Sequence, residues 1–157
     1  MLYCIYIQLN WFYDQYQRVI VFHLFVAKYL LLRQKYSMTI GNEEDLEKLR
    51  MISQVVYETL MLMKRHLQVG ITTKQLDRIG QQNLERYGAR SAPILMYDFP
   101  GHTCISINNE AAHGIPSKRK VEAGDVVNID VSAELGGYFS DTGATFTVPP
   151  VLSLIHI

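Results

Sequence analysis

NIDVSAELGGYFSDTGAT, residues 128–145, is the stretch around which the rest of the chain is organised. Its pattern predicts a β-hairpin, because the β-branched residues Ile129 and Val131 lead into the turn-forming sequence Glu134 to Gly137. Glycine favours a turn here, since it adopts positive φ without a Cβ clash. Strand-forming residues resume after the turn and continue to Phe146.

Two aspartates, one on each arm of the predicted hairpin, are candidate metal ligands. A turn centred between Leu135 and Gly136 would place Asp130 directly opposite Asp141, with their Cβ atoms about 4.5–5.5 Å apart. Two like charges at that spacing repel, and a divalent cation bound to both carboxylates would relieve the repulsion. A solvated strand face that carries two acids is the alternative, and the pattern alone leaves both interpretations open.

Composition limits the class of protein. A chain of 157 residues is one domain or part of a larger one. The net charge is zero, and the one basic run, Lys118 to Lys120, is too short to predict nucleic-acid binding. Cys4 and Cys104 lie in stretches of different character, so neither a disulfide framework nor a CxxC zinc site is predicted. A reducing, cytoplasmic location fits this cysteine usage.

The two ends differ in character from the rest of the sequence. Residues 1–37 contain six of the ten tyrosines and the single tryptophan, but no glycine and no proline. Their most apolar part, residues 19–32, is shorter than the roughly 20 residues of a membrane-spanning helix. We therefore predict that residues 1–37 are an apolar extension unrelated to the fold, with Met38 as the natural start, and that residues 151–157 are an aberrant tail. Anchoring at a membrane surface through residues 1–37 is the alternative.

The first part of the region from residue 38 to 150 has helical periodicity. Apolar residues at helical spacing predict a long helix that begins after the N-cap Asn42 and ends at Gly70. A second helix is predicted to begin at the capping box formed by Thr72 and Gln75 and to end at Gly88.

The second part of this region has the pattern of strands. Short strands are predicted at 94–96 and 103–107, with a strand end at 111–116 fixed by glycine and proline. Since helices come first and antiparallel strands follow, the predicted class is α+β rather than alternating βαβ.

Three stretches of this region together resemble one enzyme family. They read FPGHTCISIN at 99–108, AHGIP at 112–116, and DVVNIDV at 125–131 leading into GYFSDT at 137–142. At this spacing they are similar to the type I methionine aminopeptidases of bacterial kind, which have the pita-bread fold. The resemblance runs from about Thr39 to Val148. It therefore implies the first half of a pita-bread fold, with residues 38–150 as the N-terminal half of a catalytic domain.

The resemblance implies a metal centre. Members of the family bind two divalent ions, which can be cobalt, manganese, iron, zinc or nickel, through two aspartates, one histidine and two glutamates. Asp130 and Asp141 match the two aspartates. The remaining ligands of the family come from the second half of the fold, which this sequence does not include.

The resemblance also implies substrate contacts. His113 matches a catalytic histidine that hydrogen-bonds the substrate near the scissile amide; without the flanking motifs it would be interpreted as a turn histidine. Positions that line the pocket for the methionine side chain are matched by Met96, Phe99 and Cys104, for which ordinary core packing is the alternative.

The implied function is metal-dependent removal of the N-terminal methionine from nascent proteins in the cytoplasm. The expected partners are the N-terminal methionine of peptides and nascent proteins and, with the latter, the ribosome; neither nucleic-acid sequence recognition nor membrane binding is expected. The chain as given is expected to be inactive alone. A non-catalytic pita-bread binding module is the main alternative, and the presence of both aspartates argues against it. A proline-specific aminopeptidase on the same fold is a second alternative, and residues 112–116 argue against it.

Overall fold

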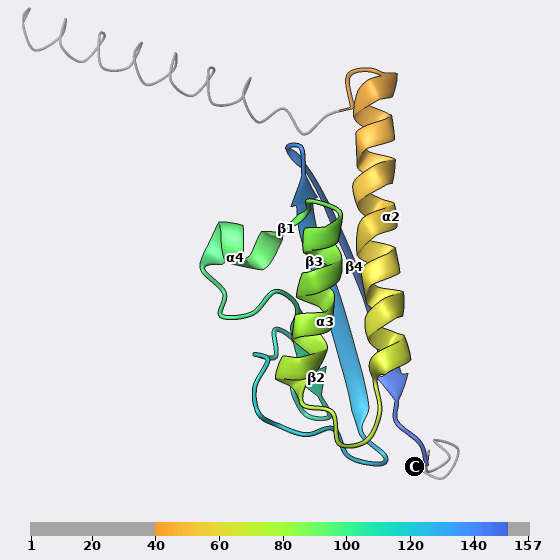
Figure 1. Cartoon of the computed structure of the whole chain (residues 1–157), viewed down its shortest axis with the longest axis vertical. Coiled ribbons are helices and arrows are strands. Elements are labelled where there is room, and N and C mark those ends of the chain that lie inside the picture. The colour runs from red at the N-terminus through yellow and green to blue at the C-terminus, as the bar shows by residue number, and fades with distance from the viewer. Residues whose placement is uncertain (1–39, 151–157) are drawn as a thin grey trace, which may run out of the picture. The chain divides into compact units, whose positions relative to one another are not determined.

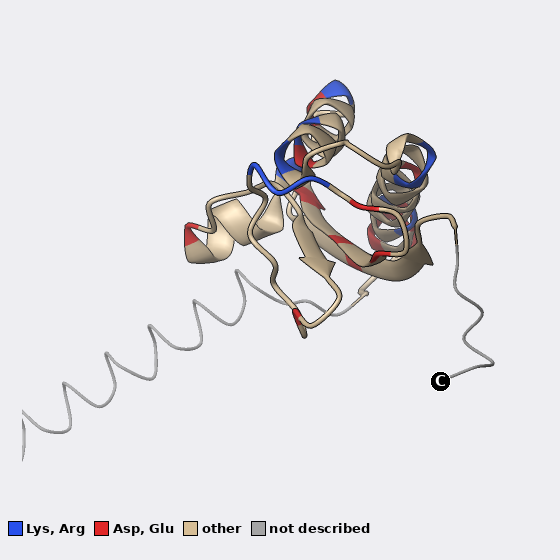
Figure 2. Ribbon diagram, turned by 90° about the horizontal axis from the view of Figure 1, so that it is seen from below, with Lys and Arg blue, Asp and Glu red and all other residues tan. Residues whose placement is uncertain are grey.

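Two long helices cover one face of a small antiparallel sheet (Figure 1, Figure 2). The computed structural model describes residues 40–150. The elements occur in the order α2, α3, β1, α4, β2, β3, β4, so the α+β class predicted from the sequence is confirmed. Within the described residues, no helix is both long enough and apolar enough to cross a membrane.

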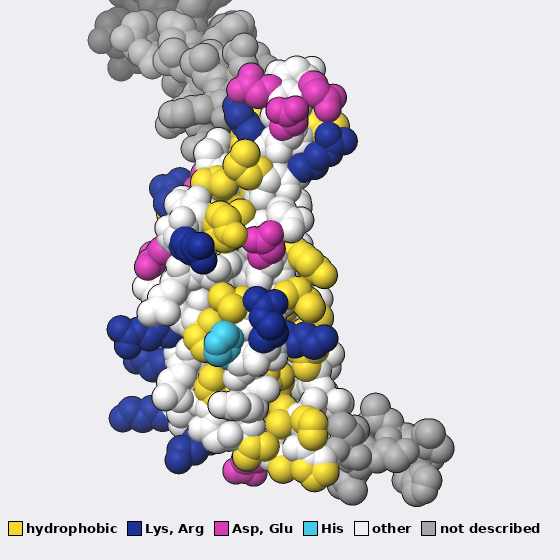
Figure 3. Space-filling view, turned by 45° about the vertical axis from the view of Figure 1, so that its right-hand side comes forward, with side chains coloured by type: hydrophobic (Ala, Val, Ile, Leu, Met, Phe, Trp, Pro, Cys, Tyr) yellow, Lys and Arg dark blue, Asp and Glu magenta, His cyan; other side chains and the backbone are white. Residues whose placement is uncertain are grey.

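Helix α2 (Glu43–His66) begins at the predicted N-cap. The side chain of Asn42 accepts a hydrogen bond from the backbone N–H of Asp45 at 2.9 Å, a cap that stabilises a helix by about 1 kcal/mol. Acids occupy the first turn and bases the last, which complements the helix dipole and gives the helix oppositely charged ends (Figure 3). Its buried face consists of Ile52, Val55, Val56, Thr59, Leu60 and Met63.

Helix α2 ends at His66, earlier than the predicted stop at Gly70. The chain leaves the helix at the C-cap Leu67 because the following backbone pairs with a distant loop. The N–H of Gly70 donates to the carbonyl of Val121 at 2.8 Å, and the N–H of Val121 donates to the carbonyl of Ile71 at 2.8 Å. Tertiary hydrogen bonds therefore decide this boundary rather than the local glycine signal.

Helix α3 (Thr73–Arg86) has both ends where the sequence predicts them. The hydroxyl of Thr72 accepts from the N–H of Gln75, and the side chain of Gln75 accepts from the N–H of Thr72, which is the reciprocal capping box. At the other end Gly88 has φ +70°, the left-handed conformation that glycine favours after a helix.

The sheet is built on β3 (Val126–Leu135). Strand β4 (Tyr138–Thr147) pairs along one edge of β3, while β1 (Arg90–Ser91) and β2 (Cys104–Ile107) pair along the other, all antiparallel. Alternate residues of β3 are fully buried and belong to the core that contains the helices; each valine or isoleucine among them contributes about 1.5–3 kcal/mol by the hydrophobic effect. These residues are Val127, Ile129, Val131 and Ala133, each 0% exposed.

The hairpin turn lies one residue later than predicted. Gly136 and Gly137 both have positive φ, +61° and +91°, and they form a two-residue turn closed by the pair Leu135 and Tyr138. This is the conformation that two-residue hairpin loops favour, because its twist matches that of the strands. The prediction that Asp130 directly opposes Asp141 is therefore wrong.

Two predicted strands are also absent. Residues 94–96 lie in a short helix, α4 (Ala92–Tyr97), because Ser91 caps its N-terminus and Pro93 occupies its first turn. Residues 111–116 form a loop rather than a strand end, and a single backbone bond, from Ile105 N–H to the carbonyl of Gly114, joins this loop to β2. The predictions made for residues 1–37 and 151–157 lie outside the described residues.

Candidate active site

The two aspartates project from one face of the sheet. Asp130 lies opposite Gly143, and Asp141 lies opposite Ser132. Because Asp130 and Ser132 are two residues apart on one strand, they share a face, and Asp141 shares that face with its cross-strand partner. The two carboxylates are thus diagonal neighbours on the face opposite the helices, which confirms the prediction that they lie on the same side of the sheet.

The electrostatics of the pair show how close the two groups are. The pKa of Asp130 is raised from its ordinary value to about 6, first by burial and then by the charge of Asp141 and a hydrogen bond with it. The charge of His113 acts in the opposite direction and lowers the pKa of Asp130. A cation is favourable beside a half-buried carboxylate whose ionisation a neighbouring negative charge opposes.

Gly143 leaves room for the carboxylate of Asp130. A Cβ at position 143 would lie 3.1 Å from Oδ1 of Asp130 and 3.4 Å from the carbonyl oxygen of Ile129. Sequence reasoning missed this residue, although a glycine within a strand is a known sign that another group approaches closely. The strand thus omits a side chain at the position opposite the metal-ligand candidate.

His113 lies in the loop between β2 and β3. Its φ is +55°, a left-handed conformation uncommon for residues other than glycine. Its side chain is exposed, and it is near enough to Asp130 for its charge to affect the pKa of that carboxyl. The structure therefore brings together four of the six residues singled out from the sequence, His113, Asp130, Asp141 and, from β2, Cys104.

Cys104 lies directly opposite Asp130 on β2 and is 7% exposed. Burial, followed by the charges of Asp130, Asp141 and Asp77, raises the pKa of its thiol to about 11. A raised pKa disfavours the thiolate at neutral pH and so argues against a nucleophilic role for Cys104. The chemistry of Cys104 allows it to serve as a small apolar surface beside the carboxylates.

Met96 and Phe99 lie on and just after α4. Met96 is 58% exposed, and Phe99 is partly buried. The peptide between this helix and β2 is held by Asp77, whose Oδ1 accepts from the N–H of His102 at 3.0 Å and from the N–H and hydroxyl of Thr103 at 2.8 Å. Helix α3 thereby fixes the start of β2.

The donor set suits a hard divalent cation but is only part of a complete site. Carboxylate oxygens are ligands that such ions prefer, and Asp130 and Asp141 present theirs from one face. Within residues 40–150, no group of three or more histidines, cysteines, aspartates or glutamates lies close enough to hold a metal ion, and this includes the neighbourhood of the two aspartates. Asp130 and Asp141 therefore fit a metal as two of its ligands.

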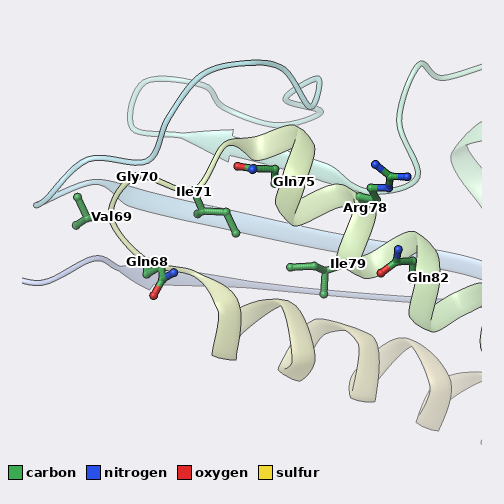
Figure 4. Close-up of a pocket in the computed structure, with 8 residues that line it drawn as sticks. All are labelled: Gln68, Val69, Gly70, Ile71, Gln75, Arg78, Ile79 and Gln82. Atoms are coloured by element: carbon green, nitrogen blue, oxygen red, sulfur yellow. The ribbon is translucent and has the colours of Figure 1, made fainter.

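A separate pocket of about 600 Å³ lies on the helical side of the molecule, where α2 leads into α3 (Figure 4). Polar side chains from the α2–α3 connection and α3 surround it, including Gln68, Gln75 and Arg78. The carboxylates face away from the helices, so this pocket is distinct from the candidate site.

Comparison with known proteins assigns the chain. Residues 46–155 match metallopeptidase family M24. The chain belongs to this family. It is 52% identical over 112 residues to methionine aminopeptidase 2 of Bacillus subtilis, in a match that covers 71% of this chain and 45% of the relative. It is 38% identical over 112 residues to the mitochondrial methionine aminopeptidase 1D of Danio rerio, covering 71% of this chain and 33% of the relative.

Solved structures of M24 relatives share the fold. The crystal structure of methionine aminopeptidase from Rickettsia prowazekii matches with a TM-score of 0.68 and 35% identity, over 72% of this chain and 46% of that one. Prolidase from Pyrococcus furiosus matches with a TM-score of 0.63 at 19% identity, over 77% of this chain and 34% of that one, and this likeness concerns the fold alone. The expected pita-bread fold and the resemblance to methionine aminopeptidases are thus confirmed. The chain spans less than half the length of these relatives.

Proposed function

We propose that this chain supplies the substrate-facing histidine and two metal ligands of a methionine aminopeptidase. The observation that carries the proposal is that Asp130 and Asp141 share one face of the sheet, with His113 near enough for its charge to act on Asp130, within a chain that belongs to metallopeptidase family M24. The most similar relatives named above are methionine aminopeptidases, which supports this activity over a proline-specific one. The retained aspartates argue against a non-catalytic binding module.

In this proposal each residue of the site has one task. Asp130 and Asp141 would hold the divalent ions, two in number by the family resemblance. A bound ion of this kind lowers the pKa of water and polarises a carbonyl oxygen, which is the chemistry that peptide hydrolysis needs. His113 would donate a hydrogen bond to the substrate beside the scissile amide and so orient that bond.

The proposed substrate is an N-terminal methionine on a peptide or nascent protein. Cys104, protonated and buried beside Asp130, would form part of the wall against the thioether side chain. Met96 and Phe99, at α4, would complete that wall from the other side of β2. Cobalt, manganese, iron, zinc and nickel are the candidate metals, the cytoplasm is the proposed location, and the ribosome is a proposed partner.

A chimera tests the proposal. The 112 matched residues of the Bacillus subtilis relative are replaced by those of this chain, so that the relative supplies the rest of the protein. We expect the chimera to release methionine from a Met-Ala peptide in the presence of manganese, cobalt or ferrous ion and to stop when the metal is chelated. Asp130→Asn keeps the shape of the side chain but removes its charge, and it should lower turnover by on the order of 100-fold or more.

The controls decide how a negative result is interpreted. The unaltered relative must be active under the same conditions, and circular dichroism must show that the chimera is folded. A folded chimera that contains metal but releases no methionine would contradict the proposed activity.

A further inference from the structure

Two hydrogen bonds hold the His113 loop against β2, one between backbone groups and one to a side-chain hydroxyl, and both involve Gly114. The N–H of Ile105 donates to the carbonyl of Gly114 at 3.0 Å, and the N–H of Gly114 donates to the hydroxyl oxygen of Ser106 at 3.0 Å. Gly114 is buried, and Ser106 is 2% exposed. Among the described residues, these are the bonds that join residues 111–116 to the sheet.

Gly114 is pressed onto the strand. A Cβ at this position would lie 2.1 Å from the carbonyl oxygen of Ile105 and 2.8 Å from Cα of Ser106. No side chain fits there, so the backbone of residue 114 is in direct contact with β2. The preceding residue, His113, takes its left-handed φ of +55° at this point of attachment.

Strand β2 pairs with the part of β3 that carries the candidate metal ligand Asp130. Ser106 lies opposite Asn128 on β3, and Cys104 lies opposite Asp130. Ser106 and Asp130 are therefore diagonal neighbours on one face of the sheet. The hydroxyl of Ser106 thus links the loop of His113 to the strand pair that positions the carboxylate.

We propose that Ser106 is a positioning residue: by accepting the N–H of Gly114, its hydroxyl fixes the His113 loop against β2, beside the strand that carries Asp130. The importance of His113 for turnover rests on the proposed function, but its placement does not. Without the hydroxyl, the buried N–H of Gly114 has lost its acceptor, and such a group costs free energy unless the loop moves to reach water. Movement of the loop displaces His113 because the two residues are adjacent.

The test uses nuclear magnetic resonance on the complete 157-residue chain without metal. Hydrogen exchange of the Gly114 amide measures whether the loop is held to β2. The change that Asp130→Asn produces in the ring-proton resonances of His113, at one fixed pH, measures whether the imidazole still lies near Asp130. Neither measurement depends on metal binding or catalysis.

Three variants give the readout. In Ser106→Ala we expect the Gly114 amide to exchange about tenfold faster, the equivalent of one lost hydrogen bond. The response of His113 to Asp130→Asn should also become smaller. Ser106→Thr restores the hydroxyl and should restore both signals. Thr59→Val removes a buried hydroxyl on α2, on the helical side of the sheet, and should leave both signals unchanged.

The outcomes separate this inference from the proposed function. A folded Ser106→Ala chain with native Gly114 exchange and a native His113 response would overturn the positioning role, whatever the activity of the chimera. If Ser106→Ala does not fold, Ser106→Cys, whose sulfur is a weak acceptor, must show the same two changes. An inactive chimera together with the expected resonance changes would refute the proposed enzyme activity and leave the role of Ser106 standing.

Discussion

Asp130 and Asp141 are diagonal neighbours across the β3–β4 hairpin, with Asp130 opposite Gly143 and Asp141 opposite Ser132. Direct opposition would put their Cβ atoms about 4.5–5.5 Å apart, whereas diagonal partners are farther apart but still within reach of each other. The diagonal arrangement keeps both carboxylates on one face of the sheet. Burial first, and then the charge of Asp141 and a hydrogen bond with it, raise the pKa of Asp130 to about 6, so the two groups still interact.

Removing one charge of this pair should stabilise the metal-free chain. We expect Asp141→Asn to raise the free energy of unfolding by up to about 1 kcal/mol in the presence of a chelator, because a repulsion between like charges is lost. The same variant should gain less stability than the native chain when manganese is added, since it has lost a ligand. Thermal unfolding with chelator and with manganese measures both effects.

The matched control for this prediction is Asp98→Asn. Asp98 is an exposed aspartate at the C-cap of α4 with φ +52°, a conformation that asparagine also accepts. It should show neither effect. If Asp141→Asn destabilises the chelated chain, the carboxylate contributes to folding in a way that the repulsion argument does not include.

A side chain at position 143 should disturb the metal site more than the fold. Gly143 does not have positive φ, so alanine is compatible with its backbone conformation, but the added Cβ would lie 3.1 Å from Oδ1 of Asp130. We expect Gly143→Ala to displace that carboxylate by a few tenths of an ångström and to weaken the binding of manganese by about tenfold, the lower end of the range for disturbed ligands. Isothermal titration calorimetry measures the affinity. Unchanged affinity would show that Asp130 adapts freely.

The sequence predicted the elements of this fold better than their boundaries and register. Both helices were predictable because their caps are local: Asn42 and the Thr72–Gln75 box act on residues three positions away. The end of α2 could not be predicted, because the backbone hydrogen bonds of Gly70 and Ile71 go to Val121, about fifty residues along the chain. Register depended on which of four turn residues occupy the loop, and only the paired positive φ values of the two glycines decide that.

In the candidate site, too, the sequence predicted some features and missed those that depend on contacts between distant residues. Asp130 and Asp141 were predicted to share a face, and that survived the error in register because a shift of two residues preserves the face. Gly143 and Ser106 were missed because their importance comes from contacts across strands and with a loop. A residue that acts only by positioning a reactive side chain does not produce a recognisable sequence motif.

Substitutions at Gly137 test the turn, because they change the backbone strain of the turn without causing a steric clash. At Gly137, φ is +91° and no atom would lie within 4 Å of an added Cβ, so substitution acts through the backbone alone. We expect Gly137→Ala to lower the free energy of unfolding by about 1 kcal/mol. Gly137→Asn should lose less, because asparagine visits the left-handed region more readily. Equal losses in urea unfolding would contradict this explanation of the register.

The buried carboxylate of Glu134 should make stability depend on pH in acid. Glu134 is 4% exposed; Arg90 donates to its Oε2 at 2.7 Å, and Gly137 donates to its Oε1. The bond from Arg90 is the main cause that lowers the pKa of Glu134 below its ordinary value of 4.5. A lowered pKa means that the unfolded chain takes up a proton first as the pH falls. The stabilisation is therefore complete above about pH 4.5 and is lost below it, as the pH falls through the pKa of the folded state.

Arg90→Met should remove most of this pH dependence. Arg90 is largely exposed, so we expect the loss of stability at neutral pH to be much smaller than that of a fully buried pair. Urea unfolding between about pH 6 and pH 3 measures it. Arg86→Met, which alters an exposed arginine of α3, should retain the native pH profile. A native acid slope in Arg90→Met would assign the slope to another group.

The 157-residue chain by itself is expected to release no methionine from a Met-Ala peptide. A divalent ion takes four or more ligands in a protein site, and Asp130 and Asp141 are the two ligand candidates that the described residues bring together. An ion held by two carboxylates keeps most of its waters and binds weakly, and the proton acceptor that hydrolysis needs is not among the matched residues. The assay supplies manganese, cobalt or ferrous ion, with a chelated sample as the control. Metal-dependent turnover by the purified chain would mean that a second copy, or a segment outside residues 40–150, completes the site; Asp130→Asn mixed with the native chain would then show whether active sites are shared between copies.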